Sequence, residues 1–193
     1  MLYEHDRQRE EARAASTSLG EFLGELQIRA SAGRVDAASL ARVAQLIHKT
    51  NQFNLTARRY TVAELERQLE EGAIACWLRA SDRFGDYGLV GAAFAVAEGT
   101  RAWRIDNFVM SCRILGRQVE TALLAAVARQ AAASGAERLI GEYVPTAKNT
   151  PARDFYASHG FRAEGDRWVW EFSGGTIELP AYLPLEWVPE GSR

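Results

Sequence analysis

Cysteine, methionine and histidine are scarce in this 193-residue chain, which contains two, two and three of them. The two cysteines, Cys76 and Cys112, do not have the spacing of a zinc site, and two are too few for a disulfide framework. We therefore expect both to be reduced thiols in a cytoplasmic protein without a bound metal.

An excess of one charge and long apolar runs are also missing. The 23 basic and 25 acidic residues give a net charge of −2, so the balance favours neither a nucleic acid nor an anionic membrane as partner. No apolar run approaches the roughly 20 residues that a membrane helix needs. Residues 1–15 are charged throughout, unlike a signal peptide.

The hydrophobic pattern predicts an α+β fold with a mixed, largely antiparallel sheet flanked by helices. Helices with N-caps are predicted to begin after Ser18, Asp36 and Thr61, and a long helix is predicted from about Gly116 to Gly135. Strands are predicted over residues 27–31, 73–80, 88–97, 101–110 and 137–144, with a strand pair within 161–172. The amide-rich residues 51–60 are predicted to form a polar loop.

Three regions are expected along the chain. Residues 1–25 are predicted to be a charged helical extension or linker, and residues 26–173 a single domain. Residues 174–193 are predicted to be an extended arm, because their prolines restrict them to a sheet edge or the surface.

A glycine-bearing turn follows the strand that ends at Met110. Arg113, Gly116 and Arg117 stand at the start of the long helix, where backbone N–H groups, the helix dipole and two full charges favour a phosphate. The turn is a candidate pyrophosphate cradle. It lacks the Gly-Lys-Ser/Thr of a Walker loop, and many loops with glycine and arginine bind nothing.

The second motif lies within residues 149–161. Asn149 and Tyr156 are seven residues apart, nearly two helical turns, so one predicted helix carries them on one face. Gly160 is a natural C-cap for that helix. An ordinary core helix that carries a tyrosine would have the same pattern.

Together the two motifs resemble the GNAT acyltransferase superfamily. The matching residues are Arg113 and Gly116 upstream, and Asn149, Ala152, Phe155, Tyr156, Gly160 and Phe161 downstream. The resemblance implies a GNAT-like fold in which the pantetheine of CoA runs between two splayed central strands, here those ending near Met110 and Tyr143. It implies that Tyr156 protonates the departing thiolate. The residues expected to bind the cofactor are Val109, Met110, Ser111, Arg113, Leu115, Gly116, Arg117, Gln118, Asn149 and Phe155. Gln118 stands where the family pattern has Gly or Ala.

A longer resemblance covers most of the chain. The stretches RVAQLIHKTNQFNLTARRYT, DRFGDYGLVG, MSCRILGRQVE and YVPTAKNTPARDFY are similar to the C-terminal region of FkbH-like proteins. In that family a haloacid-dehalogenase-type (HAD) domain comes first and loads a glyceryl group onto an acyl carrier protein for polyketide biosynthesis. Its Asp-x-Asp-x-Thr motif has no counterpart here. The resemblance implies an acyl carrier protein and a HAD-type domain, in the same or a separate chain, as partners.

Acyl transfer from a thioester needs an oxyanion donor, a base and an acid. Backbone N–H groups of residues 109–111 are candidate oxyanion donors, and Asp106 and Glu142 are candidate bases. Each role has an ordinary alternative: paired or solvated carboxylates, a core aromatic for Tyr156 and a helix cap for Asn149. Cys112 fits an acyl-accepting nucleophile or, more simply, a buried small residue.

Two functions from different classes fit the sequence. The first is an acyltransferase that uses CoA or a carrier-protein phosphopantetheine. The second is a non-catalytic GNAT-like module that docks an acyl carrier protein for a HAD-type domain. If the partner is a carrier protein, we expect Arg113 and Arg117 to meet the phosphodiester of its arm, and Arg58, Arg59 and Lys148 to meet its acidic surface.

Overall fold

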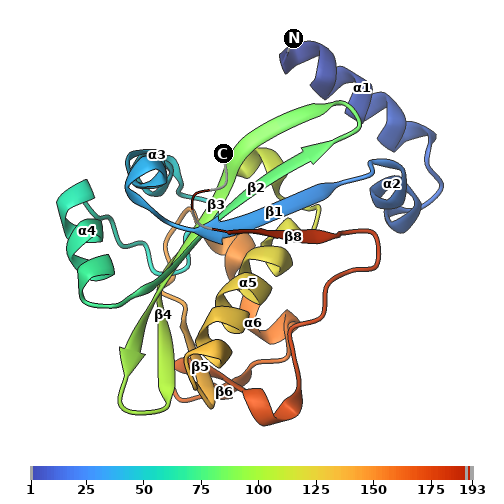
Figure 1. Cartoon of the computed structure of the whole chain (residues 1–193). Helices are drawn as coiled ribbons and strands as arrows, with labels where there is room; N and C mark the ends of the chain where they lie inside the picture. Colours follow the sequence, from blue (N-terminus) through green and yellow to red (C-terminus); the bar gives the residue numbers. More distant parts are fainter. Residues whose placement is uncertain (1, 190, 192–193) are drawn as a thin grey trace.

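One eight-stranded sheet organises the fold (Figure 1), in the order β6-β7-β5-β4-β3-β2-β1-β8. The computed structural model describes the backbone of residues 2–189 and 191, and their side chains except those of residues 2–6, 12 and 15. The strands are β1 (Arg29–Arg34), β2 (Ile74–Asp82), β3 (Gly85–Glu98), β4 (Ala102–Met110), β5 (Arg138–Glu142), β6 (Arg162–Glu164), β7 (Arg167–Glu171) and β8 (Leu185–Val188). The pairs β1–β8 and β4–β5 are parallel and the other neighbours antiparallel, which confirms the predicted fold class.

Helices cover both faces of this sheet. The helices are α1 (Leu2–Ala15), α2 (Leu19–Glu25), α3 (Ala37–Lys49), α4 (Val62–Glu70), α5 (Val119–Ala133) and α6 (Phe155–Ser158). α3 and α4 pack on one face, where Leu40, Ile47 and Leu65 share a core with Phe94 and Val109 of the sheet. α5 and α6 pack on the other face over the larger core.

The predicted N-caps are present. Asp36 and Ser39 form a reciprocal capping box at the start of α3, and Thr61 and Glu64 form one at the start of α4. Each box satisfies helix N–H groups that would otherwise lack an acceptor. Ser18 accepts a hydrogen bond from the Glu21 N–H at 3.1 Å.

Two predicted helices differ from the structure. The long helix begins at Val119 rather than near Gly116, because Gln118 has a left-handed backbone with φ 57° and cannot continue a helix upstream. The helix predicted from Asn149 is a 3₁₀ turn, Thr150–Ala152, followed by the four-residue α6. Asn149 makes no side-chain cap there. The first strand lies slightly later than predicted, at Arg29–Arg34.

Both ends of the described chain contact the domain. The guanidinium of Arg9 in α1 forms a buried ion pair with Asp82 at the β2–β3 turn, with Nε 2.8 Å from Oδ2. At the other end, β8 pairs with β1 at the sheet edge (Figure 1). The phenol of Tyr182, in the segment before β8, donates to the side chain of Gln118 at 2.7 Å.

Candidate thioester site

The central strands β4 and β5 splay apart. They pair only over residues 102–104 and 138–140 and diverge toward their C-terminal ends. Asp106 forms a β-bulge, since residues on either side of it pair with the consecutive Phe94 and Ala95 of β3. This opening is where the family resemblance places a pantetheine arm.

Residues 53–56, which we call the inserted segment, lie in that opening. The N–H of Leu55 donates to the Phe108 carbonyl of β4 at 3.1 Å, and the Met110 N–H donates to the Phe53 carbonyl at 2.9 Å. On the other side, the Val144 N–H donates to the Leu55 carbonyl at 2.8 Å. All four residues of the segment are buried. The predicted loop is confirmed, since no helix or strand includes these residues, but the loop is buried at these positions.

Aromatic packing fixes the inserted segment from the helical side. The Phe53 ring meets the Phe155 ring edge-on, with centroids 5.5 Å apart. Phe108 of β4 completes the cluster, 4.8 Å from Phe155 and 6.3 Å from Phe53. Such contacts add stability beyond the buried area alone. Phe155, a predicted cofactor contact, thus touches the chain's own segment.

Asn149 links the inserted segment to the loop after β5. Its side-chain amide donates to the carbonyls of Asn54 and Val144, each at 2.9 Å. Its oxygen accepts from the Thr146 N–H at 2.7 Å and from the Tyr143 hydroxyl at 3.1 Å. The side chain is 1% exposed, and its hydrogen-bonding capacity is used within the protein.

The backbone of residues 109–111 is likewise engaged. Met110 donates to Phe53, as described, and the Ser111 N–H donates to the Val90 carbonyl at 2.7 Å. Val109 forms an antiparallel bridge with Asn54. In this conformation neither the Met110 nor the Ser111 amide is free to stabilise an oxyanion.

The candidate bases Asp106 and Glu142 lie together, joined by two arginines. Arg58 contacts Asp106 at 2.7 Å and Glu142 at 2.9 Å. Arg104 contacts the same carboxylates at 3.0 and 3.5 Å. The Tyr60 hydroxyl also donates to Asp106 at 2.5 Å. The two carboxylates are therefore neutralised in an ion-pair network, which is the ordinary role that the sequence left open. Arg58 belongs to this network and is not free to meet an acidic carrier surface.

The network shifts the pKa values of Tyr60 and Arg104. Burial, then the hydrogen bond to Asp106, raises the pKa of Tyr60 to about 12. Burial disfavours the charged form of Arg104, but Asp106 and Glu142 outweigh it, and the pKa of Arg104 is raised. The phenol therefore stays protonated and the guanidinium charged at neutral pH.

Tyr156 is packed in the core. It is 1% exposed, its ring lies against Gly141, and its neighbours are Phe155 and Phe161 at 5.2 and 5.1 Å between centroids. Among the described residues its hydroxyl has no hydrogen-bond partner. Burial raises the pKa of Tyr156, and the Glu142 charge adds to the rise. Acid catalysis by Tyr156 would therefore require this packing to open.

The two arginines of the predicted pyrophosphate turn point to different places. Arg113 donates from Nε to the Ser111 hydroxyl at 3.3 Å and from Nη2 to the Tyr87 carbonyl at 3.2 Å. Arg117 donates to the Arg113 carbonyl at 2.7 Å and stacks over the Tyr87 ring. Arg117, Gly116 and Leu115 line a cavity of about 320 Å³ beside α1, whereas Arg113 does not.

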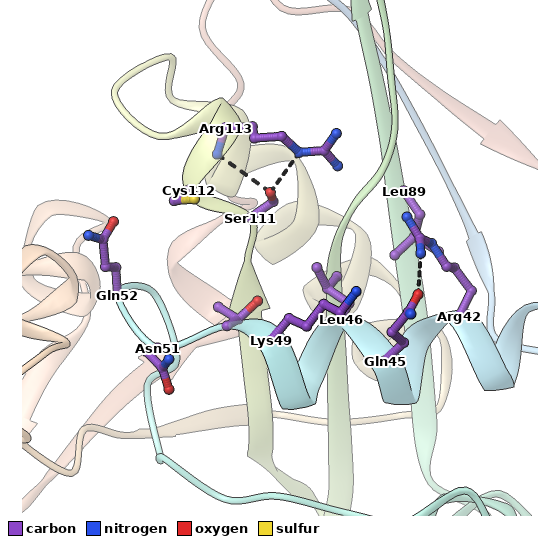
Figure 2. Close-up of a pocket in the computed structure, with 11 residues that line it drawn as sticks. Arg42, Gln45, Leu46, Lys49, Asn51, Gln52, Leu89, Ser111, Cys112 and Arg113 are labelled. Atoms are coloured by element: carbon purple, nitrogen blue, oxygen red, sulfur yellow. Dashed lines mark hydrogen bonds between the residues drawn. The ribbon is translucent and has the colours of Figure 1, made fainter. Parts of the chain in front are cut away.

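Arg113 lines a second cavity of about 490 Å³, which we call the basic pocket (Figure 2). The pocket lies between the C-terminal half of α3 and the turn after β4. Its lining residues are Arg42, Gln45, Leu46, Lys49, Thr50, Asn51, Gln52, Leu89, Ser111, Cys112 and Arg113. Cys112 is exposed, so the expectation of a buried residue was wrong. Arg42 and Lys49 were missed in the sequence, although their spacing of seven places them on one helix face.

Residues 40–161 match the model of the acetyltransferase (GNAT) family, which is well over half of the chain. The chain belongs to the acetyltransferase (GNAT) family. Solved structures of the same fold include a phosphinothricin acetyltransferase from Sinorhizobium meliloti in complex with AcCoA, with a TM-score of 0.56 and 16% identity over 79% of this chain and 93% of that one. Another is the ribosomal-protein-S18-alanine N-acetyltransferase from Escherichia coli, with a TM-score of 0.54 and 12% identity over 72% and 90%.

A third structure is the N-acetylglutamate synthase from Neisseria gonorrhoeae complexed with coenzyme A and N-acetyl-glutamate. This GNAT domain matches 35% of that chain with 74% of its own, at a TM-score of 0.55 and 17% identity. No curated protein matches the chain. In the described part, no cluster of three or more His, Cys, Asp or Glu side chains is placed to hold a metal ion. No helix there is long and apolar enough to cross a membrane.

Proposed function

We propose that this GNAT domain is a non-catalytic module that docks an acyl carrier protein for a HAD-type glyceryltransferase domain in polyketide extender- or starter-unit biosynthesis. The observation that carries the proposal is the inserted segment, residues 53–56. It bonds to β4 and to Val144 just after β5, where a thioester arm would run. The resemblance to FkbH-like C-terminal regions supports the partner and the pathway.

Moving the inserted segment out of the opening between β4 and β5 costs free energy. Displacing the segment breaks three backbone hydrogen bonds, one side-chain bond from Asn149 and the packing of Phe53 and Leu55. Each bond contributes about 0.5–1.5 kcal/mol and each buried apolar side chain roughly 1.5–3 kcal/mol. Part of the binding free energy of CoA would be spent on displacing the segment, so the apparent affinity of the protein for CoA is lowered.

The test compares CoA with a carrier protein. We expect millimolar CoA or acetyl-CoA to leave the melting temperature unchanged, and neither acetyl transfer nor hydrolysis to exceed the buffer rate. A ligand at 100 times its Kd would add about 2.7 kcal/mol, roughly 5–10 °C for a chain of this size. Holo carrier protein is expected to bind more tightly than apo carrier, with an affinity that falls as salt rises.

A second candidate, an acyltransferase that uses CoA or a carrier phosphopantetheine, is favoured by the motif residues Asn149 and Tyr156. The acetyl-CoA complex of the related Sinorhizobium meliloti enzyme supports it too. In that case the inserted segment must swing out before the thioester enters. Asp106 and Glu142 would then act as bases only after separation from Arg58.

Hydrogen exchange distinguishes the two candidates. The amides of Leu55, Met110 and Val144 are bonded across the inserted segment and should exchange slowly. An acyltransferase predicts faster exchange of Leu55 when acetyl-CoA is added, because a bound arm displaces the segment. Exchange that is the same with and without acetyl-CoA supports the docking module.

A further inference from the structure

The basic pocket carries positive charge without an internal counter-ion (Figure 2). Arg42, Lys49 and Arg113 line it, and none of its lining residues is acidic. By contrast, Arg58 and Arg104 form ion pairs with carboxylates. Within the described residues, none of the three pocket cations forms an ion pair with a carboxylate. Three such charges around one cavity attract an anion.

Two of these cations are held in place. Arg113 is anchored through Nε and Nη2 to Ser111 and Tyr87, which leaves its Nη1 group for a ligand. Arg42 is hydrogen-bonded to Gln45, one turn along the same helix face. Held donors lose less side-chain entropy on binding than free ones. Arginine also presents paired donors that match a phosphate.

The other walls suit a compact phosphorylated group. Leu46 and Leu89 form an apolar wall, and the buried Ser111 adds a hydroxyl. The volume of about 490 Å³ is ample for a phosphate with a short organic tail. The pocket is distinct from the turn of Gly116 and Gln118, which does not line it.

We propose that the basic pocket is a phosphate-binding site for a phosphomonoester or phosphodiester. Arg42 and Lys49 of α3 and Arg113 of the turn after β4 make the charged contacts. The phosphate is carried either by a free small molecule or by the phosphopantetheine arm of a carrier protein. The carrier source rests on the proposed docking function, whereas the free phosphate does not.

Cys112 provides a built-in probe. It is exposed on the pocket wall, whereas Cys76 is buried, and burial raises the pKa of Cys76 to about 12. Reagents therefore modify Cys112 selectively in the folded protein. We expect 4′-phosphopantetheine, with its thiol methylated, and inorganic pyrophosphate to slow modification by neutral iodoacetamide up to about fivefold at 80% occupancy. Potassium chloride at equal ionic strength controls for screening.

Variants connect the protection to the pocket. The double variant Arg42→Gln/Lys49→Gln should reduce the protection to less than about twofold, since each lost charge contact weakens binding roughly tenfold. Gln45→Glu, which places a negative charge inside the pocket, should abolish it. The matched control is Arg153→Gln, an exposed cation outside the pocket, and it should behave as wild type. Circular dichroism checks that each variant is folded.

The outcomes separate the two proposals. Absence of protection at 10 mM pyrophosphate, or equal protection in the double variant, overturns the phosphate site. If the small molecules protect but holo carrier binds no better than apo carrier, the site stands and docking fails. If holo carrier is preferred equally by wild type and by the double variant, docking stands and the pocket is not its phosphate site.

Discussion

Replacing Asn149 by alanine tests whether this side chain holds the fold together or waits for a cofactor. The change removes two bonds to the carbonyls of Asn54 and Val144 and two from Thr146 and Tyr143. Water can partly replace the latter two, which are not fully buried. The bond to the Val144 carbonyl is also only partly buried, whereas the Asn54 carbonyl lies inside the protein, and an orphaned buried group costs about 1–3 kcal/mol.

We therefore expect Asn149→Ala to lower the free energy of unfolding by about 3 kcal/mol. For a chain of this size this corresponds to roughly 6–12 °C in melting temperature. The assay is thermal and urea unfolding without any ligand. Lys148→Ala, at the exposed neighbour, is the matched control and should stay within about 0.5 kcal/mol of wild type.

The variant Asn149→Asp tests the same hydrogen bonds in a second way. It keeps both acceptor bonds but turns an oxygen toward two carbonyl oxygens. The loss of stability in the Asn149→Asp variant should become smaller as the pH falls, because a protonated carboxyl regains one hydrogen-bond donor. A drop of less than about 2 °C for Asn149→Ala would refute the reasoning. Asn149 would then be free for a ligand, and CoA affinity would be the property that falls.

Two further predictions concern the core and the start of α5. Gly141→Ala should destabilise the fold by about 1–3 kcal/mol, because the Tyr156 ring already fills the place of a Cβ. The control Gly20→Ala, in open space on α2, should not destabilise it. Equal effects of the two substitutions on the melting temperature would contradict the packing argument. Burial raises the pKa of Glu120, so its contribution to stability is present below its ordinary pKa and is lost as the pH rises through the raised value. Glu120→Gln should therefore raise the melting temperature at pH 7 but not at pH 4, and a shift of the same size at both pH values would contradict it.

Local sequence patterns predicted most of the secondary structure. Asp36 and Thr61 marked helix starts because a cap bonds within a few residues of itself. The strands of the central sheet followed from apolar runs between turn residues, and the fold class followed from their order. The turn at residues 113–118 and the motif at 149–161 then indicated the GNAT family, since both patterns are short and contiguous.

The contacts of the same motif residues depended on the tertiary structure. Asn149 and Tyr156 were expected to face one thioester, whereas Asn149 bonds to the inserted segment and Tyr156 packs on Gly141. Arg113 and Arg117 were expected to share a phosphate, yet they line different cavities. Gly116, with φ 77°, turns the backbone between them, and a residue pattern does not encode where each side chain then points.

The sequence by itself therefore determined most of the elements, the fold class and the family, because these depend on periodicity, caps and contiguous motifs. The tertiary structure alone decided that residues 53–56 fill the opening between β4 and β5. Their amides and hydroxyl are typical of a loop, but Phe53 and Leu55 find partners far along the chain, in β4 and α6. Whether such a loop stays at the surface or is buried between strands depends on those distant partners and not on its own composition.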